Sequence, residues 1–333
     1  MIIAVIGAGA IGSVVAAYLH KTGVDVVLVG RENQVNAIKR SGLKINGVRG
    51  EEIFRVPALT RLDKKYDLTI FTVKTQDLED AYAQNSEFLL ENSLILSTQN
   101  GVQADNILSG HFEKENMLSS IVMFGATYIE PGVVTFNFEG DWILGKPFIS
   151  VDKEVRDIAE ILKKAFTVAV STNIVGMKWL KLFVNFNNCL PALIGKSMQE
   201  TFTDMDFCKL SVMLLKEGIA VTEKVGIELV SLPSFPAERI FGLTKMPLDQ
   251  AAGIMNKTLT GLSKEPLYGS ILQSILRQKA SEIDFINGEV VLLGKQVQSM
   301  APLNLKVVDL VHRVERERRF FTPEEIKKEF SLN

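Results

Sequence analysis

Three glycines near the N-terminus have the spacing of a loop that binds phosphate groups. The run Gly7-Ala8-Gly9-Ala10-Ile11-Gly12 directly follows the β-branched segment 2–6. In such a loop the first glycine allows a tight turn, the second lets the backbone approach a pyrophosphate, and the third lets helix and strand pack closely. The following helix adds unpaired N–H groups and the positive end of its dipole. We therefore expect dinucleotide binding, the alternative being an ordinary glycine-rich turn, with contacts from Gly7, Gly9, Ala10, Ile11 and Gly12.

The residue after the next predicted strand, Val24–Val29, indicates which dinucleotide is bound. An NAD site needs an acid there to hydrogen-bond the ribose 2′-hydroxyl. This strand is followed instead by Gly30-Arg31, and a guanidinium suits a 2′-phosphate because it donates charge-assisted hydrogen bonds to it. The sequence therefore favours NADP(H) over NAD. Two alternatives stay open: Glu32 is the acid if the strand ends one residue later, or Arg31 is only a solvated side chain.

Polar side chains also follow two later predicted strands. The strand Asp67–Val73 ends at Lys74, and Ser93–Ser97 is followed by Gln99-Asn100-Gly101. In an open α/β sheet, ligands bind beyond the carboxyl ends of the strands, so Lys74 and Asn100 would face the same crevice as Arg31. Lys74 is then a second phosphate or ribose contact, unless it is a solvated loop lysine. The Asn-Gly pair is equally compatible with a plain turn.

One lysine in the second half of the chain has the surroundings expected of a proton donor. Hydride transfer to a carbonyl needs a group that protonates the oxygen, and the three histidines are scattered, so lysine or tyrosine comes into question. Lys181 and Asn185 lie four residues apart, on one face of a predicted helix, among mostly apolar neighbours. Desolvation would lower the pKa of such a lysine toward neutrality. The alternative is a Lys/Asn stripe on the protein surface.

A second polar interruption lies near residue 282. Glu282 and Asp284 cannot share a helical face, so at most one of them is expected to point inward. Ser270, twelve residues before Glu282, could cap a helix or bind a carboxylate. Taken alone, Ser270 and Glu282 would be ordinary groups on helix surfaces.

The elements predicted around these residues divide the chain in two. The strand-loop-helix-strand unit at the N-terminus is repeated with a helix over 77–90, and strands at 119–122, 133–136 and 142–144 are expected to extend the same sheet. Beyond residue 151 only 167–170 is expected to be extended, and helices are predicted at 152–166, 175–195, 205–226, 246–260, 267–300 and 304–318.

This pattern predicts an α/β Rossmann-type NADP-binding domain over residues 1–171 and an all-α substrate and catalytic domain over residues 172–333. The stretch Pro233–Pro236 is expected to be a loop, and the charged run Arg313–Arg319 a solvated helix face.

Composition agrees with a globular enzyme and argues against several other classes. The 333 residues suggest about two domains, and 47% apolar with 23% charged residues argues against disorder, collagen and coiled coil. A net charge of −2 with interspersed signs argues against a nucleic-acid partner. The first nineteen residues lack charge, but no basic segment precedes them and glycines interrupt them, so we expect neither signal peptide nor membrane span.

The cysteines and histidines indicate the compartment and argue against a metal. Two cysteines, Cys189 and Cys208, cannot form a disulfide framework, which favours a reducing cytoplasm. Neither they nor the scattered His20, His111 and His312 have metal-ligand spacing, so no metal site is expected.

Together these blocks resemble the ketopantoate reductase (2-dehydropantoate 2-reductase) family. The resemblance spans nearly the whole chain, and its blocks come in the family's order. They are the glycine loop with Gly30-Arg31, Thr72-Val73-Lys74, Gln99-Asn100-Gly101, Lys178–Leu182 with Asn185, and Ser281–Gly288. It implies NADPH-dependent reduction of a 2-oxo acid, first of all ketopantoate to pantoate in pantothenate biosynthesis, in a cleft between a Rossmann domain and a helical domain.

The resemblance also implies roles for single residues. Lys181 becomes the general acid, and Glu282 a carboxylate that contacts the cofactor ribose or polarises the lysine and the substrate hydroxyl. Arg31 and Lys74 contact the 2′-phosphate end of the cofactor, and Asn100 lies near both cofactor and substrate. The substrate contacts are then Asn100, Lys181, Asn185, Asn188 and Ser270. The expected partner is a small 2-oxo acid, and the chain could form a homodimer.

Three positions depart from the family pattern. Cys189 stands where the family commonly has a second asparagine, and Asn188 comes just before it. Ser274 stands where an aspartate is frequent, and Gly269 stands where a second serine is frequent. These residues belong to the substrate-facing helices, so they question ketopantoate more than the reaction class. Two alternatives stay open: a 3-hydroxyacid or 6-phosphogluconate-type dehydrogenase, and a non-catalytic NADP(H)-binding regulatory protein.

Overall fold

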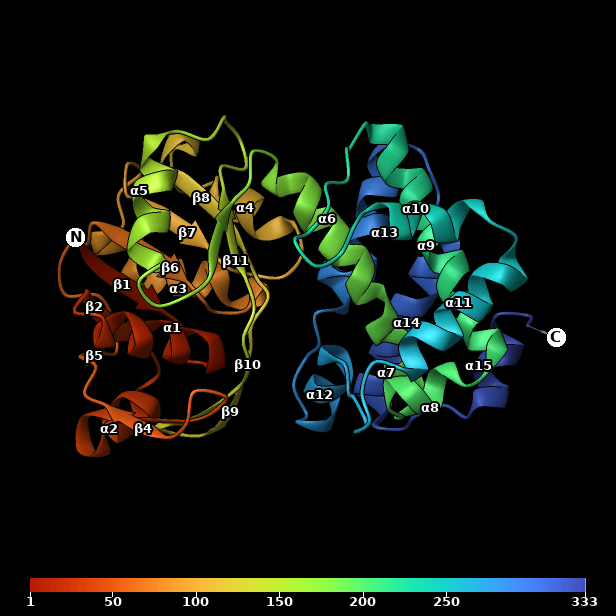
Figure 1. Ribbon diagram of the computed structural model, residues 1–333, viewed down its shortest axis with the longest axis horizontal. Helices are drawn as coiled ribbons and strands as arrows, with labels where there is room; N and C mark the ends of the chain where they lie inside the picture. Colours follow the sequence, from red (N-terminus) through yellow and green to blue (C-terminus); the bar gives the residue numbers. More distant parts are fainter. Residues whose placement is uncertain (333) are drawn as a thin grey trace. The chain divides into compact units, whose positions relative to one another are not determined.

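The computed structural model describes residues 1–332, which form two compact units (Figure 1). The first is Met1–Val175 and the second begins at Gly176. The first unit combines helices with β-sheet and the second is helical, which confirms the predicted fold class.

An eight-stranded sheet forms the centre of the first unit. Its strand order is β12-β11-β8-β7-β6-β1-β2-β5, and every neighbouring pair is parallel except β8 with β11. From β5 to β8 this is the order 3-2-1-4-5-6 of a doubly wound dinucleotide-binding sheet, whose topology reverses between β1 and β6. The strands are β1 (Ile2–Ile6), β2 (Asp25–Val29), β5 (Ala58–Leu59), β6 (Leu68–Phe71), β7 (Ile95–Ser97), β8 (Met117–Val122), β11 (Trp142–Gly145) and β12 (Val168–Val170).

The apolar runs of the central strands bury both faces of this sheet. In β1, Ile3 and Val5 point into a core shared with α1 and α5, whereas Ala4 and Ile6 point into a core shared with α3 and α4. Burial on both faces is why the sequence of β1 is continuously apolar rather than alternating. The helices of this unit are α1 (Ala10–Lys21), α2 (Glu32–Ser41), α3 (Leu78–Asn85), α4 (Gln103–Leu108) and α5 (Lys153–Leu162).

A second sheet, which the sequence did not reveal, covers α1 from the other side. Its order is β4-β3-β10-β9, made by β3 (Leu43–Gly47), β4 (Glu52–Phe54), β9 (Gly125–Glu130) and β10 (Val133–Phe138). The prediction that 133–136 extends the main sheet is therefore wrong. β10 pairs instead with β3 and β9, and Phe54 and Phe136 pack against Tyr18 of α1, with ring centroids 5.4 and 5.7 Å away.

The second unit packs its helices around α9 (Met205–Val225), which contacts α8, α10, α11, α13 and α14. Among the described residues no helix is both long and apolar enough to cross a membrane. The other helices are α6 (Ile174–Asn185), α7 (Cys189–Ile194), α8 (Met198–Phe202), α10 (Glu238–Lys245), α11 (Leu248–Thr260), α12 (Ser270–Leu276), α13 (Asn287–Gln296), α14 (Pro302–Glu317) and α15 (Pro323–Glu329).

Two predicted helices are interrupted in the structure. The expected helix over 267–300 is wrong as one element: α12 ends at Leu276, Gln278 takes a positive φ of 57°, and the single 3₁₀ turn η5 (Ile283–Phe285) precedes α13. The expected helix over 175–195 is likewise divided by the 3₁₀ turn η4 (Phe186–Asn188). Pro233–Pro236 is a loop, as predicted.

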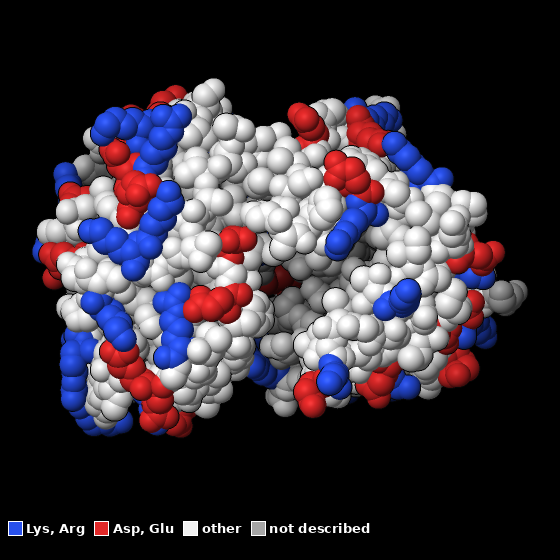
Figure 2. All heavy atoms as spheres, viewed as in Figure 1, with Lys and Arg blue, Asp and Glu red and all other residues white. Residues whose placement is uncertain are grey.

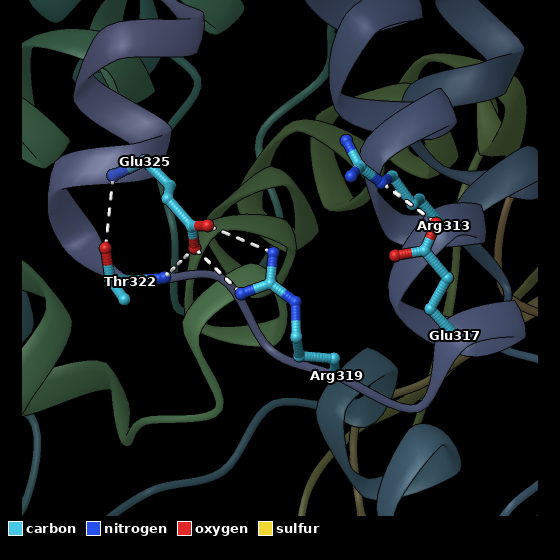
Figure 3. A network of polar contacts seen from close by, with 5 residues as sticks. All are labelled: Arg313, Glu317, Arg319, Thr322 and Glu325. Atoms are coloured by element: carbon cyan, nitrogen blue, oxygen red, sulfur yellow. Dashed lines mark hydrogen bonds and ion pairs between the residues drawn. The ribbon is translucent and has the colours of Figure 1, made fainter.

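The charged run Arg313–Arg319 forms the exposed end of α14 and the link to α15. Arg313 donates to Glu317, one helical turn later, and Arg319 pairs with Glu325, which also closes the capping box at Thr322 (Figure 3). On the face seen in Figure 2, basic and acidic side chains are interspersed in both units. The exposed part of the run thus consists of solvated ion pairs, which confirms the predicted solvated face only in part, because Val314 is buried and Arg318 and Arg319 lie beyond the end of α14.

Candidate active site

The glycine loop lies at the carboxyl end of β1, where the topology of the main sheet reverses. Gly7 has a φ of +119°, and a Cβ there would lie only 2.6 Å from the Val73 nitrogen. A Cβ on Gly12 would overlap the Gly7 carbonyl oxygen and Thr72 Oγ1, so α1 packs directly on the loop. A Cβ on Gly9 would meet nothing within 4 Å. Two of the three glycines thus serve packing, and the second leaves open space above the backbone.

Arg31 follows β2 as the N-cap residue of α2, and its side chain is exposed. Gly30 allows the end of β2 to approach the glycine loop, because a Cβ at this position would overlap that of Ala8. Burial raises the pKa of Tyr128 in β9, and the positive charge of Arg31 acts in the opposite direction, so the two side chains are neighbours. Glu32, the alternative acid, is the first residue of α2.

Gln99 joins the two strand ends that precede Lys74 and Asn100. Its Nε2 donates to the carbonyl oxygens of Phe71 and Val73, both at 2.9 Å. Lys74 is the N-cap residue of the 3₁₀ turn η1 (Thr75–Asp77), directly after the end of β6. The carboxyl ends of β6 and β7 are therefore fixed to each other, as in an open sheet that binds a ligand at this edge.

In the second unit, α6 carries Lys181 among buried apolar side chains that include Trp179, Leu180 and Leu182. Burial lowers the pKa of Lys181 from 10.5 to about 8; the Lys178 ammonium acts in the same direction, and the Glu282 carboxylate opposes both. The Lys181 ammonium is therefore a stronger acid than that of an exposed lysine.

Glu282 reaches Lys181 from a non-helical segment. It is the N-cap residue of η5 and is half-buried, whereas Asp284, two residues later, is exposed and contacts His312. The structure thus brings Lys181 and Glu282 together from positions 101 residues apart in the sequence.

Two of the expected substrate contacts lie beside each other. η4, which ends at Asn188, packs against α12, whose first residue is Ser270. A Cβ on Gly269 would overlap Asn188 Oδ1 and lie 2.8 Å from its Cγ. The departure at Gly269 is therefore linked to Asn188, because the Asn188 side chain fills the space that a serine at 269 would need. Asn185 is the last residue of α6, one helical turn after Lys181.

Cys189, another position that departs from the family pattern, is completely buried. Its Sγ donates to the Phe186 carbonyl oxygen at 3.0 Å, and burial raises the pKa of the thiol to about 12. Cys189 is thus a core residue and not a nucleophile.

Three residues with a part in this geometry were given no role of their own from the sequence, although all three lie in the blocks that carry the family resemblance. Thr72 Oγ1 donates to the carbonyl oxygens of Ile6 and Gly7, at 3.0 and 2.8 Å, and so fixes the start of the glycine loop. Gln99 holds the strand ends, and Lys178 lowers the pKa of Lys181. Helical spacing pointed only to Lys178, which lies three residues before Lys181 in a helix without acids.

The first unit fits a dinucleotide phosphate. α1 begins at Gly9 with no side-chain cap and with no acid in its first turn. Its first N–H groups therefore have no partner within the helix and point into the space that Gly9 leaves open.

Comparison with known proteins decides the family. The model "Ketopantoate reductase PanE/ApbA" matches residues 3–147, and the C-terminal model of the same family matches residues 173–315. The chain belongs to the ketopantoate reductase family. It is 31% identical to a 2-dehydropantoate 2-reductase of Pyrococcus horikoshii, over 93% of this chain and 96% of that protein, and 30% identical to one of Pyrococcus abyssi, over 93% and 97%.

Solved structures agree with this assignment. A PanE/ApbA family ketopantoate reductase from Ralstonia eutropha is 26% identical, with a TM-score of 0.80 over 95% of this chain and 99% of that one. A D-mandelate dehydrogenase in complex with NADH and anilino(oxo)acetate has the same fold, with a TM-score of 0.81 at 23% identity over 95% and 99%. The chain is therefore an oxidoreductase of the ketopantoate reductase family, which uses a nicotinamide cofactor.

Proposed function

We propose that this protein reduces a 2-oxo acid to the 2-hydroxy acid with NADPH, and that ketopantoate is its substrate, as a step of pantothenate biosynthesis. The observation that carries the proposal is Lys181, an ammonium with a pKa of about 8 next to the Glu282 carboxylate. The names of the Pyrococcus relatives support the choice of substrate.

The cofactor residues belong to the first unit. The loop of Gly7, Gly9, Ala10, Ile11 and Gly12 would hold the pyrophosphate, and Arg31 and Lys74 the 2′-phosphate end. Asn100, which follows β7, would lie near the cofactor and contact the substrate. When bound, the nicotinamide supplies the hydride to the carbonyl carbon.

The second unit supplies the proton. As the carbonyl carbon accepts the hydride, Lys181 donates a proton from its Nζ to the carbonyl oxygen, and its positive charge stabilises the developing alkoxide. Glu282 keeps the lysine protonated and contacts the cofactor ribose or the substrate hydroxyl. Asn185, Asn188 and Ser270 hold the substrate carboxylate and side chain.

Replacement of the proton donor tests this mechanism. Lys181→Ala should lower kcat about 10²- to 10⁴-fold, the usual contribution of a general acid, and leave NADPH affinity nearly unchanged. The matched control is Lys196→Ala, an exposed lysine of the same unit. Steady-state kinetics gives kcat, and fluorescence titration gives the affinity for NADPH. A Lys181→Ala protein with near-normal kcat on its best 2-oxo acid would contradict the assignment.

The choice of NADPH over NADH depends on Arg31. Loss of a charge-assisted phosphate contact costs about 1.5–3 kcal/mol, so Arg31→Ala should raise the KM for NADPH on the order of ten- to a hundredfold and leave that for NADH unchanged. Arg40→Ala, at the other end of α2, is the control. Equal use of NADH and NADPH by the wild type would show that Arg31 does not select the cofactor.

A substrate panel tests the choice of ketopantoate. Rates with ketopantoate, other aliphatic 2-oxo acids and an aromatic one should be compared, because the D-mandelate dehydrogenase with this fold binds an anilino(oxo)acetate. Assays in the oxidative direction separate the reductase from a 6-phosphogluconate-type dehydrogenase. Absence of turnover on the whole panel, with NADPH still bound, would favour a regulatory binding protein.

A further inference from the structure

The segment that carries Glu282 is fixed to α14 at two points. The Ser281 backbone nitrogen donates to Glu315 Oε1 at 2.8 Å, and Asp284 Oδ1 lies 2.9 Å from His312 Nε2. His312 Nδ1 in turn lies 3.1 Å from Glu315 Oε2, one helical turn away. His312 therefore connects the two fixed points, one on each side of Glu282.

These contacts require a protonated histidine. Carboxylate oxygens only accept hydrogen bonds, so both ring nitrogens must donate, and only the imidazolium does so. Partial burial acts to lower the pKa of His312, but the hydrogen bonds and charges of Asp284 and Glu315 outweigh it and raise that pKa above 6.5. Above the raised pKa, a ring lone pair faces a carboxylate and one fixed point is lost.

Solvent reaches this network. His312 and Glu315 line a groove of about 740 Å³ formed by residues of α12, α14 and the segments that follow them. The other charged groups that line it are Lys279, Arg316 and Arg318. Asp284 and Glu315 are the groups whose hydrogen bonds and charges raise the pKa of His312.

We propose that His312 is a positioning residue for the reaction: its imidazolium holds the Ser281–Asp284 segment so that the Glu282 carboxylate stays beside the Lys181 ammonium. The inference rests on the proposed function, because it matters for turnover only if Lys181 and Glu282 act there. Since Glu282 raises the pKa of Lys181, a loosened segment lets that pKa fall below about 8. The acid form of Lys181 is then lost at a lower pH.

The test measures the Lys181 proton directly in the ligand-free full-length protein. Competitive trace acetylation at several pH values, read by peptide mass spectrometry, gives the pKa of Lys181 with exposed lysines as internal references. His312→Ala should lower that pKa by about half a unit or more. His312→Arg supplies a permanent cation that can donate to both carboxylates, and should retain it.

A matched control is His111→Ala. His111 also contacts one carboxylate, Glu79 at 2.8 Å, but it lies in the first unit. This variant should leave the pKa of Lys181 unchanged. In kinetics, His312→Ala should move the high-pH fall of kcat to lower pH, a shift that general destabilisation would not give and that His111→Ala should not show.

A second comparison separates this inference from the proposed function. Glu282→Gln should lower the pKa of Lys181 by itself, and adding His312→Ala to it should give no further shift. If Glu282→Gln lowers the pKa and folded His312→Ala does not, the positioning role is wrong and the mechanism stands. If Lys181→Ala keeps its activity, the mechanism itself fails.

Should His312→Ala not fold, Asp284→Ala removes one of the two fixed points and keeps His312 on Glu315. It should lower the pKa of Lys181 by a smaller amount, and no shift in this variant overturns the inference.

Discussion

At the scale of single residues, the candidate acid is tuned by two opposite charges. After burial, the Lys178 ammonium is the next cause that lowers the pKa of Lys181, and Glu282 raises it. Lys178 is itself buried, so its charge is poorly screened.

Removal of the Lys178 charge should therefore strengthen the hold of Lys181 on its proton. In Lys178→Met the like charge is lost, the pKa of Lys181 rises, and the fall of kcat expected near pH 8 moves to higher pH. Lys178→Arg keeps the charge and should keep the wild-type profile. Measurement of kcat from pH 6 to 10 checks both variants. A fall that moves to lower pH in the Met variant would show that Lys178 acts otherwise than through its charge.

Sequence alone was sufficient for some of these residues and not for others. Lys181 and Arg31 could be selected as candidates because Lys181 interrupts an apolar helical pattern and Arg31 follows a strand, whereas Glu282 received its role from the family resemblance. His312 could not, because its partner Asp284 lies 28 residues away in the sequence and meets it only through the packing of α14 on η5. The dependence of the Lys181 pKa on Lys178 and Glu282 likewise needs the fold.

At the scale of elements, the glycine loop allows a test that separates binding from folding. Gly9 has an extended backbone, with φ −80° and ψ −160°, and a Cβ there meets nothing. Gly9→Ala should therefore change stability by no more than about 0.5 kcal/mol. It should weaken NADPH binding at least about tenfold, because the methyl group occupies the approach of the pyrophosphate.

Gly12→Ala is the matched contrast. Its Cβ would overlap the Gly7 carbonyl oxygen, so this variant should lose stability as well as binding. Urea denaturation and NADPH titration of both proteins provide the comparison. If the Gly9→Ala protein bound NADPH with wild-type affinity, this loop would not be the site that binds the pyrophosphate.

The breaks within the second unit explain why helix bounds were the weakest prediction. No proline or glycine lies between Leu276 and Asn287, so the sequence pattern predicts that the helix continues through this region. The chain turns there because tertiary contacts, such as that of Ser281 with Glu315, outweigh local preference. This turn takes Glu282 out of a helix and allows it to approach Lys181.

At the scale of the whole molecule, local patterns predicted most strands of the main sheet, but not β5, and missed the second sheet. The order β5-β2-β1-β6-β7-β8 follows from a repeated strand-helix unit with short connections. β10 pairs with β3, about ninety residues earlier in the chain. An alternating strand pattern does not indicate which strand is the pairing partner.

The last helix, α15, lies beyond residue 315, where the family match ends, yet it is part of the core of the second unit. Ile326 is completely buried, and the Phe321 nitrogen donates to the Leu193 carbonyl oxygen at 2.9 Å. Lys327 bridges Asp204 and Asp206 at 2.8 and 2.9 Å, but it is partly exposed.

Apolar burial should therefore hold α15 more strongly than its ion pairs do. Ile326→Ala should lower the free energy of unfolding by about 2–5 kcal/mol, the usual cost of a buried cavity. Lys327→Met should cost at most about 1 kcal/mol, because exposed charges are screened by solvent. Urea denaturation measures both, with the exposed Lys328→Ala as control. If Ile326→Ala is as stable as that control, α15 is an appendage and the second unit ends with α14.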